Sequence, residues 1–276
     1  MIGVLMRAKI ITGTVFLMLS FAPANAETLT IGGTGAALST MRALGEVFMQ
    51  EHPDVQVAVL SSLGSGGGIR ALAAGKLDIA ILGRPIKSKE QVRIPKARAI
   101  QFGTTPLALV TSHKNVDAIT TAQLAKILEG LTLEWPDSSQ VSYILRPKKE
   151  TDTILLAAYS PLLAIALEKA RARPSLLMAF TDQETMDKAE KVSGALTTAA
   201  ISAIISERRA LKPLRLDGIV PTLENVANGT YVLIRHGYLV LRPGATVVAR
   251  KFSDFVLSAK GRGILRANGY LPTKSN

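Results

Sequence analysis

Residues 61–75 read Ser-Ser-Leu-Gly-Ser-Gly-Gly-Gly-Ile-Arg-Ala-Leu-Ala-Ala-Gly, which places a glycine-rich loop between two regular patterns. The apolar, β-branched run 55–60 before the loop indicates a buried strand, and Ile69, Leu72 and Ala73 after it indicate a short helix. A glycine-rich loop in this position can hold an anion on its backbone N–H groups, or it can simply make a turn. The loop alone does not decide between these two roles.

The same order of strand, glycine turn and helix recurs on both sides of this loop. Upstream, residues 28–31 alternate like a strand, 32–35 form a glycine-rich turn, and apolar residues at helical spacing run from 38 to 48. Downstream, 77–82 is a third apolar strand, which ends at Gly83-Arg84-Pro85. Strands that alternate with helices predict an α/β fold with parallel strand pairs. Ligands of such sheets bind at the carboxyl ends of the strands, where these loops lie.

The region from about 106 to 218 repeats this pattern with new strands and helices. Strands are predicted at 107–111, 141–145 and 214–216, and helices at 121–128, from about 153 and from 160, where a serine cap precedes a proline. Residues 229–241 alternate again, and 251–265 is predicted to be helical with a break near Gly261. We therefore predict two lobes, with residues 27–105 and 225–276 in lobe 1 and residues 106–224 in lobe 2.

The N-terminus has the pattern of a secretory signal peptide. Arg7 and Lys9 precede the apolar run 10–21, and Ala24-Asn25-Ala26 is a small-residue cleavage site. The apolar run is too short to span a bilayer comfortably, although an uncleaved anchor is the alternative. We expect residues 1–26 to be removed and the chain from Glu27 onwards to be exported.

Composition narrows the class of protein further. The chain has 276 residues, no cysteine and a formal net charge of +12. Without cysteine the exported protein has neither disulfides nor a lipid-modified residue at its cleavage site. The basic balance suggests an anionic partner. Nucleic acid is disfavoured, because aromatic residues make up only 5% of the chain and do not interleave with the basic ones.

Enzyme signatures fail when they are tested one by one. Residues 33–38 approximate a dinucleotide-binding glycine motif, but the motif fails at its sixth position and lacks the later acidic ribose ligand. The sequence contains no Walker loop, nucleophile elbow or metal-ligand spacing. His52, His113 and His236 are isolated among polar or charged neighbours, as surface histidines are. We therefore expect no enzymatic activity, no metal and no cofactor.

Three predicted helix N-termini remain as candidate binding groups, at residues 34–37, 65–68 and 151–153. Such termini present unpaired N–H groups and a partial positive charge to an anion. Arg84 and Arg146 stand at strand ends beside them, and arginine offers a planar fork for an oxyanion. Each loop alone is as consistent with a turn, but the three loops with two arginines favour an oxyanion site.

The motifs also occur in a particular order along the chain. His52-Pro-Asp-Val-Gln-Val is followed by Gly64-Ser-Gly-Gly-Gly-Ile and by Gly75-x-x-Asp78-Ile-Ala, and related motifs continue through 124–130, 218–231 and 252–272. This order resembles the periplasmic phosphate-binding proteins that feed phosphate ABC importers. The resemblance covers nearly the whole chain after the signal peptide. It implies an α/β fold of the type II periplasmic-binding-protein class, a two-lobed clamshell in which each lobe is a mainly parallel sheet flanked by helices.

The resemblance also implies which residues bind the ligand. Ser65 matches the family serine that holds phosphate together with neighbouring N–H groups, and Arg146 matches the arginine before the second-lobe loop. That loop is usually Gly-Ser-Gly-Thr in the family and reads Glu-Thr-Asp-Thr at 150–153 here. The full predicted ligand-binding set is Thr34, Gly35, Ala36, Ala37, Ser65, Gly66, Gly67, Arg84, Arg146, Thr151, Asp152 and Thr153.

One departure from the family pattern leads to a hypothesis. Some family members place an aspartate after the third strand, where it accepts the proton of hydrogen phosphate, whereas Gly83 stands there in this chain. We hypothesise that Asp152 in the second lobe has taken over this role. The alternative is that Asp152 only caps the helix that begins near Thr153.

The resemblance implies binding without chemistry, with inorganic phosphate or a related oxyanion as the ligand. It further implies that the protein is a periplasmic monomer whose partner is the permease of an ABC importer in the inner membrane. Three alternatives stay open from the sequence. The protein could be a sensor module for a membrane receptor, it could bind another oxyanion or a small organic acid, or it could be an exported enzyme.

Overall fold

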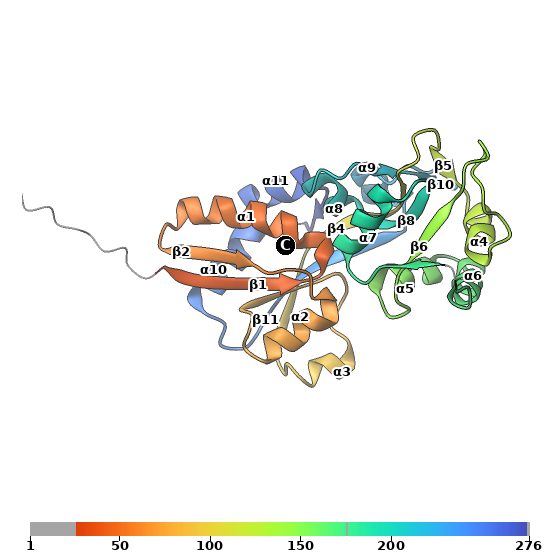
Figure 1. Cartoon of the computed structure of the whole chain (residues 1–276). Helices are drawn as coiled ribbons and strands as arrows, with labels where there is room; N and C mark the ends of the chain where they lie inside the picture. The colour runs from red at the N-terminus through yellow and green to blue at the C-terminus, as the bar shows by residue number, and fades with distance from the viewer. Residues whose placement is uncertain (1–25, 175, 275–276) are drawn as a thin grey trace, which may run out of the picture.

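The computed structural model describes residues 26–174 and 176–274 (Figure 1). The predicted signal peptide therefore lies outside the described residues, apart from Ala26. In the part of the chain that is described, no helix is long and apolar enough to cross a membrane.

Strands and helices alternate from the start of the described chain, as predicted. The first group consists of β1 (Glu27–Gly33), the 3-10 helix η1 (Gly35–Ala37), α1 (Leu38–Glu51), β2 (Val55–Val59), α2 (Gly64–Ala73), β3 (Ile79–Leu82) and α3 (Ser88–Gln91). The second group consists of β4 (Arg98–Thr111), β5 (Ala118–Ile119), α4 (Thr121–Glu129), β6 (Ser142–Leu145), α5 (Thr151–Tyr159), α6 (Pro161–Arg171), β7 (Leu177–Met178), α7 (Asp182–Lys191), β8 (Ala195–Ala200) and α8 (Ile201–Ser206). The last group consists of β9 (Lys212–Pro213), β10 (Arg215–Leu216), α9 (Leu223–Ala227), β11 (Ile234–Leu241), α10 (Val247–Leu257), α11 (Ala259–Ala267) and β12 (Leu271–Pro272).

Helix boundaries follow local capping chemistry in most places. Ser160 caps α6 by accepting the N–H of Leu162, and Pro161 occupies the first turn, which confirms the predicted start. The break predicted near Gly261 is found three residues earlier, at Ser258, whose hydroxyl accepts the N–H of Gly261 and caps α11. Gly261 is a glycine because a Cβ there would lie 2.2 Å from the carbonyl oxygen of Phe255.

Ten of the described strands form one mixed sheet with the order β2-β1-β3-β11-β4-β8-β6-β7, in which the short β9 and β12 also pair with β4, and β5 and β10 form a separate two-stranded sheet. The outer pairs β1–β2, β1–β3, β6–β8 and β6–β7 are parallel, whereas β11 pairs antiparallel with β3 and β4, and β4 pairs antiparallel with β8. The predicted α/β fold class is confirmed, with parallel pairing in the outer strands and antiparallel pairing around β4 and β11. β4 begins at Arg98, nine residues before the predicted strand at 107, because its first half is held by pairing with β11.

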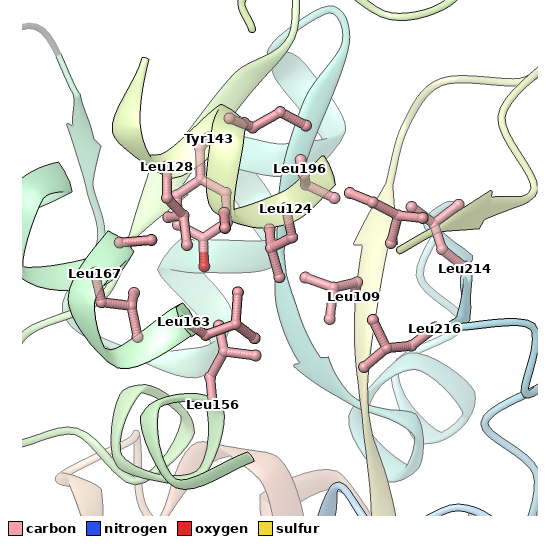
Figure 2. Close-up of a cluster of buried hydrophobic side chains, with 14 of the residues drawn as sticks. Leu109, Leu124, Leu128, Tyr143, Leu156, Leu163, Leu167, Leu196, Leu214 and Leu216 are labelled. Atoms are coloured by element: carbon pink, nitrogen blue, oxygen red, sulfur yellow. The ribbon is translucent and has the colours of Figure 1, made fainter. Parts of the chain in front are cut away.

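The hydrophobic core divides into clusters on the two sides of the molecule. One cluster joins residues between 29 and 102 with residues between 239 and 270. Another contains only residues between 107 and 233, among them Leu109, Leu124, Tyr143 and Leu196 (Figure 2). In Figure 1, β1, β2 and α1 lie toward one end and β6, α4 and α6 toward the other. This distribution supports the predicted two-lobe division, whose boundaries stay a prediction.

Candidate ligand-binding site

Two arginine and two aspartate side chains are buried together at the junction of the two halves of the molecule. Arg146 directly follows β6, Asp152 lies in the first turn of α5, Asp182 begins α7, and Arg235 lies on β11. Their residues are 3%, 0%, 6% and 2% exposed, in that order. Burial of so much charge is costly unless every group is paired, so the contacts within this cluster decide what the site can do.

Arg235 joins segments that are far apart in the sequence. Its Nη1 donates to Asp152 Oδ1 at 2.6 Å and to Asp182 Oδ1 at 2.8 Å, and its Nη2 donates to Thr34 Oγ1 at 2.6 Å. A Cβ built on Gly83 would lie 2.8 Å from Arg235 Nε. The missing side chain at Gly83 therefore makes room for the guanidinium, which gives a physical reason why an aspartate does not stand there.

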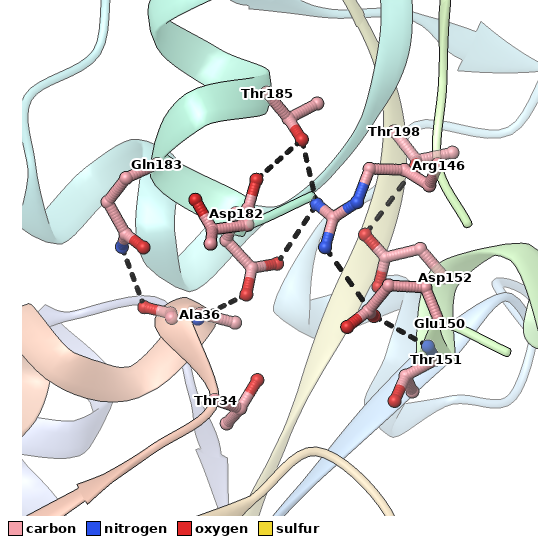
Figure 3. Close-up of polar contacts among 12 residues, drawn as sticks. Thr34, Ala36, Arg146, Glu150, Thr151, Asp152, Asp182, Gln183, Thr185 and Thr198 are labelled. Carbon is pink, nitrogen blue, oxygen red and sulfur yellow. Dashed lines mark hydrogen bonds and ion pairs between the residues drawn. The ribbon is translucent and has the colours of Figure 1, made fainter. Parts of the chain in front are cut away.

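Arg146 lies between Asp182 and Glu150 (Figure 3). Its Nη1 donates to Thr185 Oγ1 at 2.9 Å and lies 3.6 Å from Asp182 Oδ1. Its Nη2 lies 3.5 Å from Glu150 Oε2, which is an ion-pair distance without a hydrogen bond. Within the described residues, Arg146 Nε and Nη2 and Arg235 Nε are buried N–H groups without a hydrogen-bond acceptor. Such groups are rare in native proteins and point to an acceptor that binds from outside the chain.

Two carboxylates of the protein already lie at helix N-termini in this region. Asp182 Oδ2 accepts the N–H of Ala36 in η1 at 3.1 Å, so the first predicted loop has an internal anion. Glu150 Oε2 accepts the N–H of Thr151 at 2.6 Å at the start of α5. A Cβ built on Gly64 would lie 3.8 Å from Glu150 Oε1, so the N-termini of α2 and α5 are close neighbours. The half-buried Glu150 carboxylate lies between them.

The two buried aspartates have opposite pKa shifts. Burial raises the pKa of Asp152 to about 6; Arg235 opposes this rise and the negative charge of Asp182 adds to it. Burial acts on Asp182 in the same direction, but Arg235, Arg146 and the Ala36 N–H outweigh it and lower its pKa to about 2. The pair therefore takes up one proton near pH 6, while Asp182 stays ionised.

Asp152 is expected to make the protein less stable as the pH rises from about 4 to 7. Its folded pKa of about 6 lies above the usual 3.8, so its contribution to stability is complete below pH 4 and is lost as the pH passes 6. A shift of about two units corresponds to about 3 kcal/mol. Asp182 does not change in this range, since a lowered pKa costs stability only at more acidic pH.

Urea unfolding of the wild type and of Asp152→Asn across this pH range measures the effect. The variant should lack the loss, so the difference in free energy of unfolding between the two proteins should change with pH. Parallel pH profiles for the two proteins would contradict the assignment.

Most of the predicted ligand-binding residues come together around this cluster. Thr34 binds Arg235, and Gly35, Ala36 and Ala37 form η1 beside Asp182. Ser65 is buried, and its Oγ accepts the N–H of Gly83 at 3.0 Å, while Gly66 and Gly67 lie in the first turn of α2. Thr151, Asp152 and Thr153 are buried in the first turn of α5, which begins two residues earlier than predicted. Asp152 is therefore not the helix cap, because Glu150 is.

Arg84 does not join the cluster. Its guanidinium forms two hydrogen bonds with Glu90, at 2.8 and 2.7 Å, and its Nη1 also donates to the carbonyl of Pro85. The predicted role of Arg84 in ligand binding stays a prediction, and Glu90 already engages both of its terminal nitrogens. The three histidines are half-buried instead of exposed; His113, for example, bonds Ser139 Oγ at 2.9 Å.

The sequence interpretation missed Asp182 and Arg235. The alternating pattern of β11 could have pointed to Arg235. Alternate residues of this strand are buried, and Arg235 is a charged residue at one of the buried positions. Asp182 follows Thr181, which caps α7, and an acidic residue in a first helical turn is too common to indicate a site. Among the described residues, no group of three or more His, Asp or Glu side chains could hold a metal ion.

The mixed sheet flanked by helices, with buried polar groups at its strand ends, places the protein in the class of α/β binding proteins. A family described as the PBP superfamily domain matches residues 22–260, so the chain belongs to that superfamily. It is similar to the protein SphX of Synechococcus elongatus, with 28% identity over 91% of this chain and 79% of SphX. It is also similar to the phosphate-binding protein PstS of Bacillus subtilis, with 24% identity over 89% of this chain and 80% of PstS.

A solved structure supports the same fold. It is a protein of Clostridium perfringens, described as a phosphate ABC transporter substrate-binding protein and solved with bound phosphate. The match covers 90% of this chain and 100% of that one, with a TM-score of 0.76 and 20% identity.

Proposed function

We propose that this protein is an exported solute-binding protein that captures phosphate between two lobes and delivers it to an ABC importer. The observation that carries the proposal is that three N–H groups of the buried charged cluster, Nε and Nη2 of Arg146 and Nε of Arg235, have no acceptor. An oxyanion offers several acceptor oxygens within one small group and can satisfy such groups together. Binding of this kind forms and breaks no covalent bond, so the proposed function is not enzymatic.

The place proposed for the anion lies between the first turns of α2 and α5, beside Arg146. Ser65, Gly66 and Gly67 supply N–H groups from one side, and the first turn of α5 supplies them from the other. Glu150 now lies between these turns and is partly exposed, so it can leave toward solvent and give up its contacts to the entering anion. The internal anion at η1, Asp182, is buried and is proposed to stay.

The site is expected to prefer a protonated oxyanion. With Glu150 displaced, the buried Asp152 and Asp182 still balance the charges of Arg146 and Arg235, so a fully ionised anion meets repulsion that is relieved when a proton lies between two oxygens. Phosphate carries such a proton near neutral pH and sulfate does not. The name of the PstS relative, a phosphate-binding protein, and the bound phosphate of the Clostridium structure agree with this choice of ligand.

The remaining features of the proposal follow from the sequence. Residues 1–26 would direct export to the periplasm, residues 27–105 with 225–276 would form lobe 1, and residues 106–224 would form lobe 2. The protein would work as a monomer that docks on the permease in the inner membrane.

Phosphate is expected to bind one-to-one to the refolded protein, and sulfate much more weakly. In Asp152→Asn the ratio of phosphate to sulfate affinity should fall about 30-fold, because one charge-assisted hydrogen bond is worth about 2 kcal/mol. Isothermal titration of both anions into both proteins at neutral pH measures the ratio. Unfolding and refolding the protein before titration removes any carried ligand.

A matched control is Asp254→Asn, which removes an exposed aspartate outside the site and should leave the ratio unchanged. Absence of heat with phosphate from folded wild-type protein would refute phosphate as the ligand. Binding with an unchanged ratio in Asp152→Asn would refute only the role of Asp152.

A further inference from the structure

A second group of cations lines a pocket outside the buried cluster. The pocket has a volume of about 370 Å³ and lies against α2, α3 and the segment before α5. Six cationic side chains line it together with one acid, Glu90; the cations are Arg70, Arg84, Lys87, Lys89, Arg93 and Lys149. The proposed phosphate site does not use any of these side chains.

These cations differ from several other basic residues of the protein in having few acidic partners. Lys148, Lys169, Lys212 and Lys260 each form an ion pair, and Arg209 forms ion pairs with three acids. In the pocket only Arg84 is paired, with Glu90. Within the described residues, the other five cations of the pocket form no ion pair.

The charges of the pocket also act on one another. Burial lowers the pKa of Lys87, and the neighbouring Arg84 and Lys89 lower it further, while Glu90 opposes the change. Glu90 already accepts three hydrogen bonds, from both terminal nitrogens of Arg84 and from the N–H of Lys87. Like charges held together around a cavity favour the binding of a counter-ion with several negative charges.

The chemistry of the walls narrows the choice of ligand. Ile69 is the one apolar side chain that lines the pocket, and no aromatic ring does, so nothing there would hold a nucleobase or an acyl chain. Orthophosphate carries about two negative charges and would leave most of the cations unpaired. We propose that the pocket is a binding site for condensed phosphates, linear chains of linked phosphate groups such as tripolyphosphate.

Gly66 lies between this pocket and the proposed phosphate site. A Cβ there would lie 3.7 Å from Arg70 Nη1 and 4.0 Å from Arg84 Nη2, so the absence of a side chain opens the first turn of α2 toward the pocket. The hydroxyl of Ser65, by contrast, is directed toward Gly83 on the sheet side. The two sites therefore use opposite sides of one helical turn, and the inference does not depend on orthophosphate binding.

Isothermal titration of tripolyphosphate into the purified protein, in excess orthophosphate and at low ionic strength, tests the proposal. Arg70→Gln/Arg93→Gln should weaken tripolyphosphate binding about 30-fold, since two charge-assisted contacts are lost, each weaker than a buried one because both arginines are exposed. The slope of log affinity against log salt should become about two units less steep. The matched control Lys76→Gln/Lys191→Gln removes two exposed cations elsewhere and should change the affinity less than about 3-fold.

Four outcomes would overturn the proposal. Tripolyphosphate could fail to bind, or the two double variants could lose affinity equally, which would indicate general attraction to a basic protein. Excess orthophosphate could abolish tripolyphosphate binding, which would place both ligands in one site. An acidic tetraglutamate peptide could bind as tightly as tripolyphosphate, which would make the pocket a contact for acidic protein segments. A parallel titration of orthophosphate alone tests the proposed function separately.

Discussion

Replacing Arg235 with methionine is expected to lower the free energy of unfolding by about 5 kcal/mol at neutral pH, because breaking a buried ion pair leaves uncompensated charge. Arg235 is 2% exposed and is the direct partner of both Asp152 and Asp182. Methionine fills a similar volume, so the loss reports charge more than packing. Urea unfolding at pH 7.5 and at pH 5 measures the effect, which should shrink at the lower pH, where Asp152 takes up a proton.

The double variant Arg235→Met/Asp152→Asn isolates the charge effect. It should recover about half of the loss, because one of the two unpaired carboxylates is then a neutral amide. The control Arg242→Met changes an exposed arginine at the end of the same strand and should shift stability by less than about 0.5 kcal/mol. Wild-type stability in Arg235→Met would show that Arg235 does not neutralise the buried acids.

Truncation of Arg146 to alanine is expected to weaken phosphate binding by at least about 100-fold, since two buried charge-assisted hydrogen bonds are each worth about 1.5–3 kcal/mol. Arg146 is 3% exposed and has two N–H groups without an acceptor. Lys148 stands two residues further on, is exposed, and pairs with Glu168 at 2.8 Å. Lys148→Ala should therefore change phosphate affinity less than about 2-fold. Isothermal titration of phosphate into both variants measures the difference.

Arg146→Lys separates loss of charge from loss of geometry. Lysine keeps the charge but lacks the planar fork, so this variant should fall between wild type and Arg146→Ala. Thermal unfolding of each variant establishes that the protein titrated is folded. Equal affinities for phosphate in Arg146→Ala and Lys148→Ala would argue against the proposed place of the anion.

Patterns in consecutive residues determined several strands and helices and the place of the candidate site. Apolar runs, glycine turns and capping residues are written in consecutive residues, so β1, β2, β6 and the helices after them could be predicted from the sequence. The positions of Arg146, Ser65 and the residues at 151–153 follow from the same patterns, because carboxyl ends of parallel strands lie at one edge of a sheet. The break between α10 and α11 was predicted three residues too late, near Gly261, because a close contact with the end of α10, and not a turn, requires that glycine.

The tertiary structure alone decided the charge balance of the site. Arg235 meets Asp182 and Asp152 across 53 and 83 residues of sequence, and this meeting depends on the pairing of β11 between β3 and β4. The first half of β4 likewise becomes a strand because β11, and at Gly103 and Thr104 also β12, pairs with it. The raised pKa of Asp152 and the lowered pKa of Asp182 depend on burial and on distances to neighbouring charges, which no local pattern specifies. Sequence pattern thus placed the helix termini and strand ends, whereas long-range packing set which charges face one another there.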